Sequence, residues 1–147
     1  MTSSIKSIMN ENVLDKTVLV RADLNIPMSN GKISDQSRVE RVIPTINFLK
    51  SSGAKIVICS HLGRPNGKYN KKYTLKPLVE ILSNILETNV RFSNSCLGQE
   101  ALEIKTSLKA GEILLLENVR FHEEEINNSL SFAKKLSEGC DLFVNDA

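Results

Sequence analysis

The stretch Val18-Leu-Val-Arg-Ala-Asp-Leu-Asn-Ile-Pro27 joins a short apolar run to a polar one, and it decides the fold. Its first part, Val18–Val20, is apolar and rich in β-branched residues, which is typical of a strand buried on both faces of a sheet. Runs of the same kind recur at Ile56–Cys59, Ile113–Leu116 and Leu142–Val144, with a weaker candidate at Asn89–Phe92. We therefore predict a parallel sheet built from these runs.

Longer amphipathic stretches separate the strand candidates. From Leu75 to Leu86 the apolar residues keep a spacing of three and four, which predicts a helix. Thr74 is the expected N-cap of this helix, because a threonine hydroxyl can accept a hydrogen bond from a free N–H of the first turn. Pro77 would then fall in the first turn, where its missing N–H costs little.

Two further helices follow from the same spacing. Val39–Leu49 is amphipathic and contains Pro44, which we expect to kink this helix or to mark its early turns. Leu130–Leu136 predicts a last helix that Gly139 can terminate. Strands that alternate with helices at this spacing predict an α/β fold, a Rossmann-like three-layer α/β/α arrangement with a parallel sheet.

Composition excludes several classes of protein. The 147 residues suit one domain, and the net charge of +2 comes without a basic block, which argues against a nucleic-acid interface. Three isolated cysteines indicate reduced thiols in a cytoplasmic protein, and no apolar run has membrane-spanning length. The sequence contains no Walker loop, no GxGxxG fingerprint and no paired-histidine zinc motif, so we expect no metal site and no nucleotide site in this chain.

Polar clusters follow the predicted strands at the point where each strand ends. Because ligands of open α/β sheets bind outside the carboxyl ends of the strands, these clusters predict a site at one edge. The clusters are Arg21–Pro27, Ser60–Pro65, Glu117–His122 and Asn145–Ala147.

The chemistry of these clusters fits a small anion that also carries a hydroxyl group. Arg64 and Arg120 offer forked donors that match phosphate or carboxylate oxygens, and His61 can add a hydrogen bond. Asp23 and Asn25 cannot neutralise an anion, but they can bind a hydroxyl group. Taken singly, an Arg-x-Asp pair is more often a surface ion pair and a His-x-Gly-Arg loop more often a turn; the ordered set is what favours a site.

The same clusters resemble the phosphoglycerate kinase family, and the resemblance covers essentially the whole chain. The matching segments occur in family order: Val18–Pro27, Asp35–Arg38 through Ile43–Ile46, Ser60–Pro65, Thr74–Val79, Leu116–Phe121 and Phe143–Ala147.

The resemblance implies phosphoryl transfer between 1,3-bisphosphoglycerate and ADP, which gives 3-phosphoglycerate and ATP. It implies Arg38 as the catalytic residue, at the polar start of the Val39–Leu49 helix. A cation there opposes the helix dipole, so helix stability does not explain its position. The substrate-binding residues that the resemblance implies are Asp23, Leu24, Asn25, Arg38, His61, Leu62, Gly63, Arg64 and Arg120.

The resemblance also implies a particular domain organisation. Residues 1–147 would be the N-terminal phosphoglycerate-binding domain, incomplete at its C-terminal end, with the nucleotide-binding domain and its Mg-ATP or Mg-ADP outside this chain. We expect this chain alone to be inactive, and the full-length enzyme to be a cytoplasmic monomer that binds neither nucleic acid nor membrane. A non-catalytic anion-binding or interaction module derived from the kinase is the alternative. A dinucleotide-binding oxidoreductase domain would share the fold class but lacks its fingerprint.

Overall fold

The computed structural model describes residues 12–26, 28–29, 32–33, 36–123 and 130–146, so that Pro27, Asp35 and Ala147 of the motifs above lie outside it. Its elements are, in chain order, β1 (Thr17–Ala22), β2 (Met28–Ser29), β3 (Lys32–Ile33), α2 (Ser37–Ser51), β4 (Lys55–Cys59), the 3₁₀ turn η1 (Lys71–Tyr73), α3 (Leu78–Leu86), β5 (Val90–Ser93), α4 (Gln99–Ser107), β6 (Ile113–Leu116), the 3₁₀ turn η2 (Val119–Phe121), α6 (Leu130–Leu136) and β7 (Leu142–Asp146).

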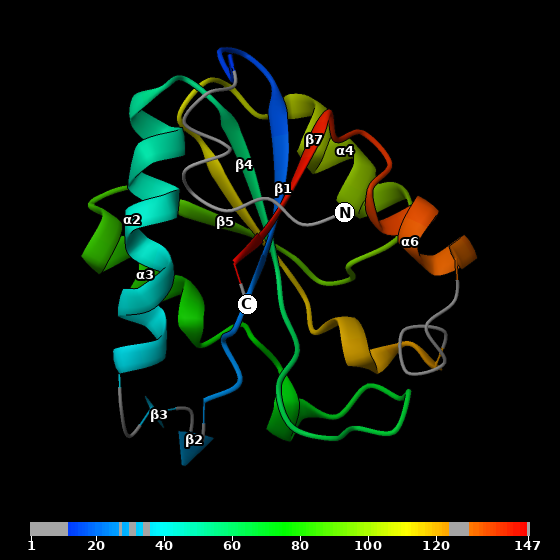
Figure 1. Ribbon diagram of the computed structural model, residues 1–147. Helices are drawn as coiled ribbons and strands as arrows, with labels where there is room; N and C mark the ends of the chain where they lie inside the picture. Colours follow the sequence, from blue (N-terminus) through cyan, green and yellow to red (C-terminus); the bar gives the residue numbers. More distant parts are fainter. Residues whose placement is uncertain (1–11, 27, 30–31, 34–35, 124–129, 147) are drawn as a thin grey trace.

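Five strands form one parallel sheet in the order β5-β6-β4-β1-β7 (Figure 1). All five predicted strands are present, and the weakest candidate is displaced by one residue, to Val90–Ser93. The first strand is an inner strand, next to the edge strand β7, since Val18 pairs with Ile56 of β4 on one side and with Leu142 of β7 on the other. The short antiparallel pair β2–β3 lies outside this sheet and was not predicted.

Helices cover both faces of the sheet, which confirms the predicted three-layer arrangement. In Figure 1, α2 and α3 lie on one side of the sheet and α4 and α6 on the other. Alternate residues of β1 supply two separate cores: Val18 and Val20 pack in the core under α2 and α3, whereas Leu19 packs in the core under α4 and α6. A strand segment that faces two cores must be apolar on both faces, which is why Val18–Val20 in the middle of β1 is an unbroken apolar run.

The predicted start of α3 was wrong. The helix begins at Leu78 with Pro77 as its N-cap, not at Leu75 with Thr74 as the cap. Leu75–Pro77 is instead a tight turn, closed by a hydrogen bond from Leu78 N to the carbonyl of Leu75 at 2.9 Å. The Thr74 hydroxyl donates to the Glu117 carboxylate at 2.5 Å, so it fastens the turn to the β6 exit.

The other helices differ less from expectation. α2 runs continuously from Ser37 to Ser51 with Pro44 inside it, on the exposed face, where water can reach the carbonyl that the proline ring leaves without a donor. Gly139 follows α6 in the left-handed region, with φ of +83°, as its terminating role requires. The helix α4 was not predicted, because its buried residues are Ala101 and Lys105, and a lysine reads as a solvent-facing position.

Candidate functional site

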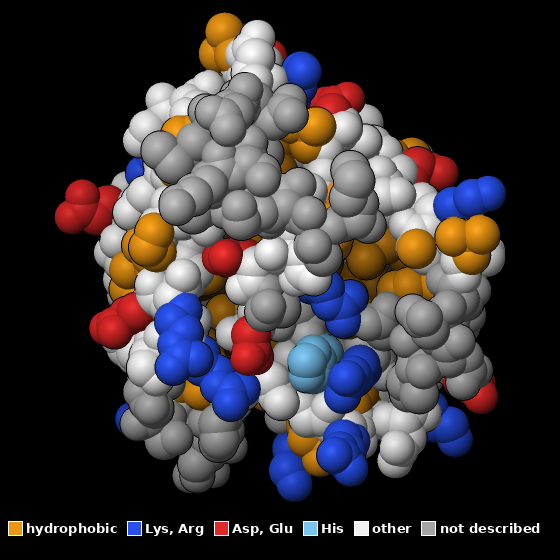
Figure 2. Space-filling view, viewed as in Figure 1, with side chains coloured by type: hydrophobic (Ala, Val, Ile, Leu, Met, Phe, Trp, Pro, Cys, Tyr) orange, Lys and Arg blue, Asp and Glu red, His pale blue; other side chains and the backbone are white. Residues whose placement is uncertain are grey.

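The predicted polar clusters meet at one edge of the sheet, here called the carboxyl edge, because all five strands run in the same direction. In Figure 1 this edge lies in the lower half, below β1 and β4. Figure 2 shows lysine and arginine side chains gathered there around a histidine. Hydrogen bonds join the loops: Leu24 N donates to Ser60 Oγ at 2.9 Å, and Val119 N donates to the carbonyl of Ser60 at 3.1 Å.

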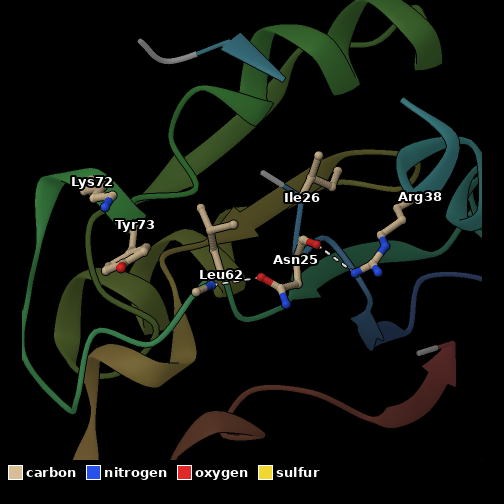
Figure 3. A pocket seen from close by; sticks show the side chains of 7 residues that line it. Asn25, Ile26, Arg38, Leu62, Lys72 and Tyr73 are labelled. Carbon is tan, nitrogen blue, oxygen red and sulfur yellow. Dashed lines mark hydrogen bonds between the residues drawn. The ribbon is translucent and has the colours of Figure 1, made fainter. Parts of the chain in front are cut away.

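The Leu62–Gly63 peptide lies between two asparagine side chains. Its N–H, from Gly63, donates to Oδ1 of Asn25 at 2.9 Å (Figure 3), and its carbonyl, from Leu62, accepts from Nδ2 of Asn118 at 2.8 Å. Because Oδ1 of Asn25 is engaged, the Nδ2 amide is the group that this side chain can offer to a ligand. Leu24 and Leu62 are themselves 0% and 4% exposed, so neither side chain is open to a ligand.

Glycine is required at position 63 for two independent reasons. Its φ of +62° lies in the left-handed region, which side chains with a Cβ disfavour. A Cβ at this position would also overlap the ring of Tyr73. The loop therefore approaches Tyr73 as closely as a bare backbone allows.

Arg38 lies in the first turn of α2 and reaches back to the β1 exit. Its Nη1 donates to the carbonyl of Asn25 at 2.7 Å and to Oδ1 of Asp23 at 3.3 Å. The side chains of Arg38 and Asp23 are 44% and 43% exposed, so their ion pair stabilises the fold little and leaves the cation open to a ligand. Arg38 also borders a small cavity of about 80 Å³, with Asp23, Arg41 and Asp146 among its lining residues.

A larger hollow of about 460 Å³ opens beside these groups (Figure 3). Arg38 and the pair Lys72–Tyr73 border opposite sides of it, with Asn25 between them. The Lys72 ammonium lies 5.6 Å from the centroid of the Tyr73 ring. Sequence reasoning missed Lys72 and Tyr73, since nothing in a Lys-Lys-Tyr stretch marks it as part of a site. The described residues that line the hollow are Asn25, Ile26, Arg38, Leu62, Gly63, Lys72 and Tyr73.

The three predicted phosphate-binding residues lie outside that lining. His61 and Arg120 are half-buried, Arg64 is exposed, and they occupy the neighbouring loops after β4 and β6. The carbonyl of Arg120 accepts from Gly67 N at 3.2 Å, which holds the two loops together. Of the predicted residues, Asn25, Arg38, Leu62 and Gly63 thus border the hollow, and Asp23 lines the small cavity beside Arg38. Leu24 is buried, and His61, Arg64 and Arg120 form a second group in the loops after β4 and β6.

Glu117 and Asn118, which follow β6, are buried at 4% and 0% exposure. Glu117 accepts hydrogen bonds from Leu75 N and Asn118 N, both at 2.9 Å, besides the bond from Thr74. Sequence reasoning placed both residues in a polar cluster but gave neither a role. Their distant partners, among them Leu75 for Glu117 and Leu62 for Asn118, lie 42 and 56 positions away along the chain, so only the folded structure reveals these contacts.

No group of histidine, cysteine or carboxylate side chains suited to a metal ion occurs among the described residues. The same part of the chain holds no helix with the length and apolarity to cross a membrane. Cys59, Cys96 and Cys140, all within the described residues, form no disulfide; the first two are buried and Cys140 is half-buried.

A three-layer α/β domain with polar loops at its carboxyl edge belongs to a large class of ligand-binding folds, and comparison with known proteins narrows it. The family model described as Phosphoglycerate kinase matches residues 8–147. A phosphoglycerate kinase from Borrelia garinii subsp. bavariensis is 49% identical over 145 residues, which cover 98% of this chain and 37% of the relative. One from Leptospira biflexa is 47% identical over 137 residues, 93% of this chain and 35% of the relative.

Solved structures agree. The crystal structure of phosphoglycerate kinase from Pyrococcus horikoshii matches with a TM-score of 0.83 and 39% identity, over 95% of this chain and 36% of that one. The structure from Coxiella burnetii gives 0.82 and 38%, over 94% of this chain and 34% of that one. This chain belongs to the phosphoglycerate kinase family, as its motifs predicted. It spans a little over a third of the length of the curated relatives that it matches.

Proposed function

We propose that this chain forms the phosphoglycerate-binding wall of a phosphoglycerate kinase, an enzyme of glycolysis that transfers a phosphoryl group between 1,3-bisphosphoglycerate and ADP. The observation that carries the proposal is the meeting of three loops at one edge, with Arg38 held over the β1 exit at 2.7 Å from the carbonyl of Asn25. Family membership supports the same reaction. Residues 1–147 would be the N-terminal domain, in part or whole.

Each predicted residue has a role that its position suits. His61, Arg64 and Arg120 would bind the phosphate of 3-phosphoglycerate, because they bring donors, and cationic charge in the two arginines, to adjoining loops. Asp23 and the Nδ2 amide of Asn25 would bind the hydroxyl and carboxyl end. Leu24, Leu62 and Gly63 would contribute backbone shape rather than side-chain contacts, since both leucine side chains are buried.

Arg38 would act on the phosphoryl group in transit. Phosphoryl transfer depends on alignment and on stabilisation of charge more than on covalent help from the protein. The guanidinium keeps five N–H donors, and the two acceptors that now hold it, the carbonyl of Asn25 and the carboxylate of Asp23, engage only Nη1. The rest of the guanidinium can therefore meet the carboxyl and phosphoryl oxygens without losing its anchor.

The nucleotide would be held by the part of the family's length that this chain does not span. Mg-ATP or Mg-ADP would bind there, and phosphoryl transfer would need both walls to close and exclude water. We therefore propose that residues 1–147 alone bind phosphoglycerate weakly and do not turn over. The full-length enzyme would be a cytoplasmic monomer without nucleic-acid or membrane partners.

The test is a pair of assays. In the full-length protein, a coupled assay should detect ATP consumption that depends on 3-phosphoglycerate. Arg64→Gln should raise the KM for 3-phosphoglycerate by about tenfold, since one charge-assisted contact is lost, while leaving thermal stability unchanged. Lys134→Gln is the matched control, because this exposed lysine on α6 loses the same charge away from the carboxyl edge.

Three results would count against the proposal. Absence of any dependence on 3-phosphoglycerate would overturn it. Binding of 3-phosphoglycerate by the full-length protein without turnover would favour the alternative, a non-catalytic anion-binding module. Normal turnover by residues 1–147 alone would refute the assignment of the nucleotide site to another part of the protein.

A further inference from the structure

Asn118 is a buried amide whose three hydrogen-bonding functions are all used. Its side chain is 0% exposed. Oδ1 accepts from Arg120 N at 2.9 Å, which starts the η2 turn. Nδ2 donates to the carbonyl of Leu62 at 2.8 Å and to the carbonyl of Tyr73 at 3.0 Å. One side chain therefore joins the loop after β6, the loop after β4 and the end of η1.

These bonds continue beyond Asn118 through a single peptide group. The Leu62–Gly63 peptide accepts from Asn118 on its carbonyl side and donates to Oδ1 of Asn25 on its N–H side. Asn25 in turn accepts from Arg38 through its backbone carbonyl at 2.7 Å. An unbroken series of hydrogen bonds thus leads from the turn of Arg120, through Asn118, to Arg38 on the far side of the hollow.

The series fixes how far apart the two groups of predicted site residues lie. Arg120 is on one side of Asn118, and Asn25 and Arg38 are on the other. A ligand that bridges them needs both groups in the right relative place, and a displacement of about 1 Å can cost a hundredfold in rate. Asn118 is buried and lies outside the hollow's lining, so it contributes through its partners rather than by direct contact with a ligand.

We propose that Asn118 is a positioning residue for phosphoglycerate: it holds the Arg120 turn and the Leu62–Gly63 peptide in the spacing that the substrate requires. This inference rests on the proposed function, since it assigns Asn118 to the binding of that same substrate. It predicts that loss of the amide weakens phosphoglycerate binding specifically, beyond any loss of stability.

Lys105 provides a matched control for the purely structural alternative. It is 2% exposed, and its Nζ donates to two backbone carbonyls, of Leu136 at 2.7 Å and of Glu138 at 3.0 Å. Like Asn118, it is a buried side-chain nitrogen that fastens backbone from another segment. It does so between α4 and the end of α6, away from the carboxyl edge (Figure 1).

The experiment compares Asn118→Leu, Asn118→Ser and Lys105→Met in the full-length protein. Leucine keeps the branched shape of asparagine and removes every side-chain hydrogen bond, and serine is the smaller, milder variant should Asn118→Leu fail to fold. For the Asn118 variants we expect the KM for 3-phosphoglycerate to rise by about ten- to a hundredfold while the KM for Mg-ATP changes less than about twofold. Lys105→Met should lower the melting temperature and leave both KM values unchanged.

The outcomes separate the two proposals. If folded Asn118 variants keep the wild-type KM for 3-phosphoglycerate, or if both KM values rise equally in Asn118 and Lys105 variants, Asn118 is a structural residue only and this inference is wrong. If the unaltered protein shows no dependence on 3-phosphoglycerate, the proposed function fails, and the role of Asn118 falls with it.

Discussion

The carboxyl edge and the α4–α6 layer contain the same kind of buried, hydrogen-bonded side chain, with a different role in each region. In each region a buried nitrogen, of Asn118 or of Lys105, donates to two backbone carbonyls. At the carboxyl edge those carbonyls belong to Leu62 and Tyr73, which both border the hollow, whereas in the α4–α6 layer they belong to the end of α6 and the turn that follows. Burial and complete hydrogen bonding therefore do not distinguish a structural residue from a functional one. The distinction depends on whether its hydrogen-bond partners lie beside site residues.

The largest effect is expected at the carboxyl edge, from Arg38→Ala in the full-length protein. Removal of a cation aimed at the charge in transit should lower kcat by about a hundred- to a thousandfold, with a much smaller effect on the KM for 3-phosphoglycerate. Stability should fall by less than about 1 kcal/mol, because the pair with Asp23 is nearly half exposed. Steady-state kinetics and thermal unfolding measure the two effects.

Arg41→Ala is the control for that variant. Arg41 is exposed, lies one turn further along α2 and borders the small cavity but not the hollow. An equal loss of kcat in Arg41→Ala would indicate a general effect of charge, and an unchanged kcat in Arg38→Ala would remove Arg38 from the catalytic role.

A smaller difference, in stability and in affinity for 3-phosphoglycerate, is expected between Gly63→Ala and Gly98→Ala. Both glycines have positive φ, +62° and +93°, so alanine strains the backbone at either, by about 1–3 kcal/mol. A Cβ at Gly98, the N-cap of α4, meets nothing within 4 Å, whereas a Cβ at Gly63 overlaps the ring of Tyr73. We expect Gly98→Ala to lower stability alone, and Gly63→Ala to lower it further and to weaken 3-phosphoglycerate binding. Calorimetric titration of both variants checks this; equal affinities would contradict it.

The smallest predicted effect concerns Cys140, beside Lys105 in the α4–α6 layer. Burial raises the pKa of this thiol, the positive charge of Lys105 opposes the rise, and Asp141 adds to it. Alkylation by iodoacetamide should therefore need a higher pH than for a free thiol, and Lys105→Met should raise the pKa of Cys140 further. Because the folded thiol keeps its proton longer, stability should decline slightly as pH rises from the pKa of the unfolded thiol through that of the folded one. If the midpoint of the pH-rate profile for alkylation of Cys140 lies at a pH no higher than that of glutathione, the raised pKa is refuted.

The sheet could be predicted because a strand with a core on each face is a continuous apolar run in the sequence, such as Ile113–Leu116. Sequence reasoning missed α4 because an inward lysine inverts the expected pattern. It misjudged the start of α3 because Leu75–Pro77 forms a separate tight turn, in which Thr74 Oγ1 accepts from Lys76 N at 3.2 Å and donates to Glu117. Propensity describes a residue's local preferences, and a distant partner can override them.

The candidate site divides in the same way. Asn25 and Gly63 were found in the clusters that follow the predicted strands, and Arg38 through the family resemblance; the structure brings all three together at one hollow. Lys72, Tyr73 and the linking role of Asn118 were not found, since the bond from Asn118 to Leu62 spans 56 positions and the bond to Tyr73 spans 45.

The pairing of β1 with β7 has a consequence for synthesis of the chain on the ribosome. The side of the first strand that pairs with β7 stays uncovered until Leu142, the partner of Val18, has been synthesised. At about 5–20 residues per second, that wait lasts on the order of ten seconds, during which one edge of an apolar strand is open to other nascent chains. The earlier arrival of β4 covers the other side of β1, so β1 itself has one open side until β7 is made.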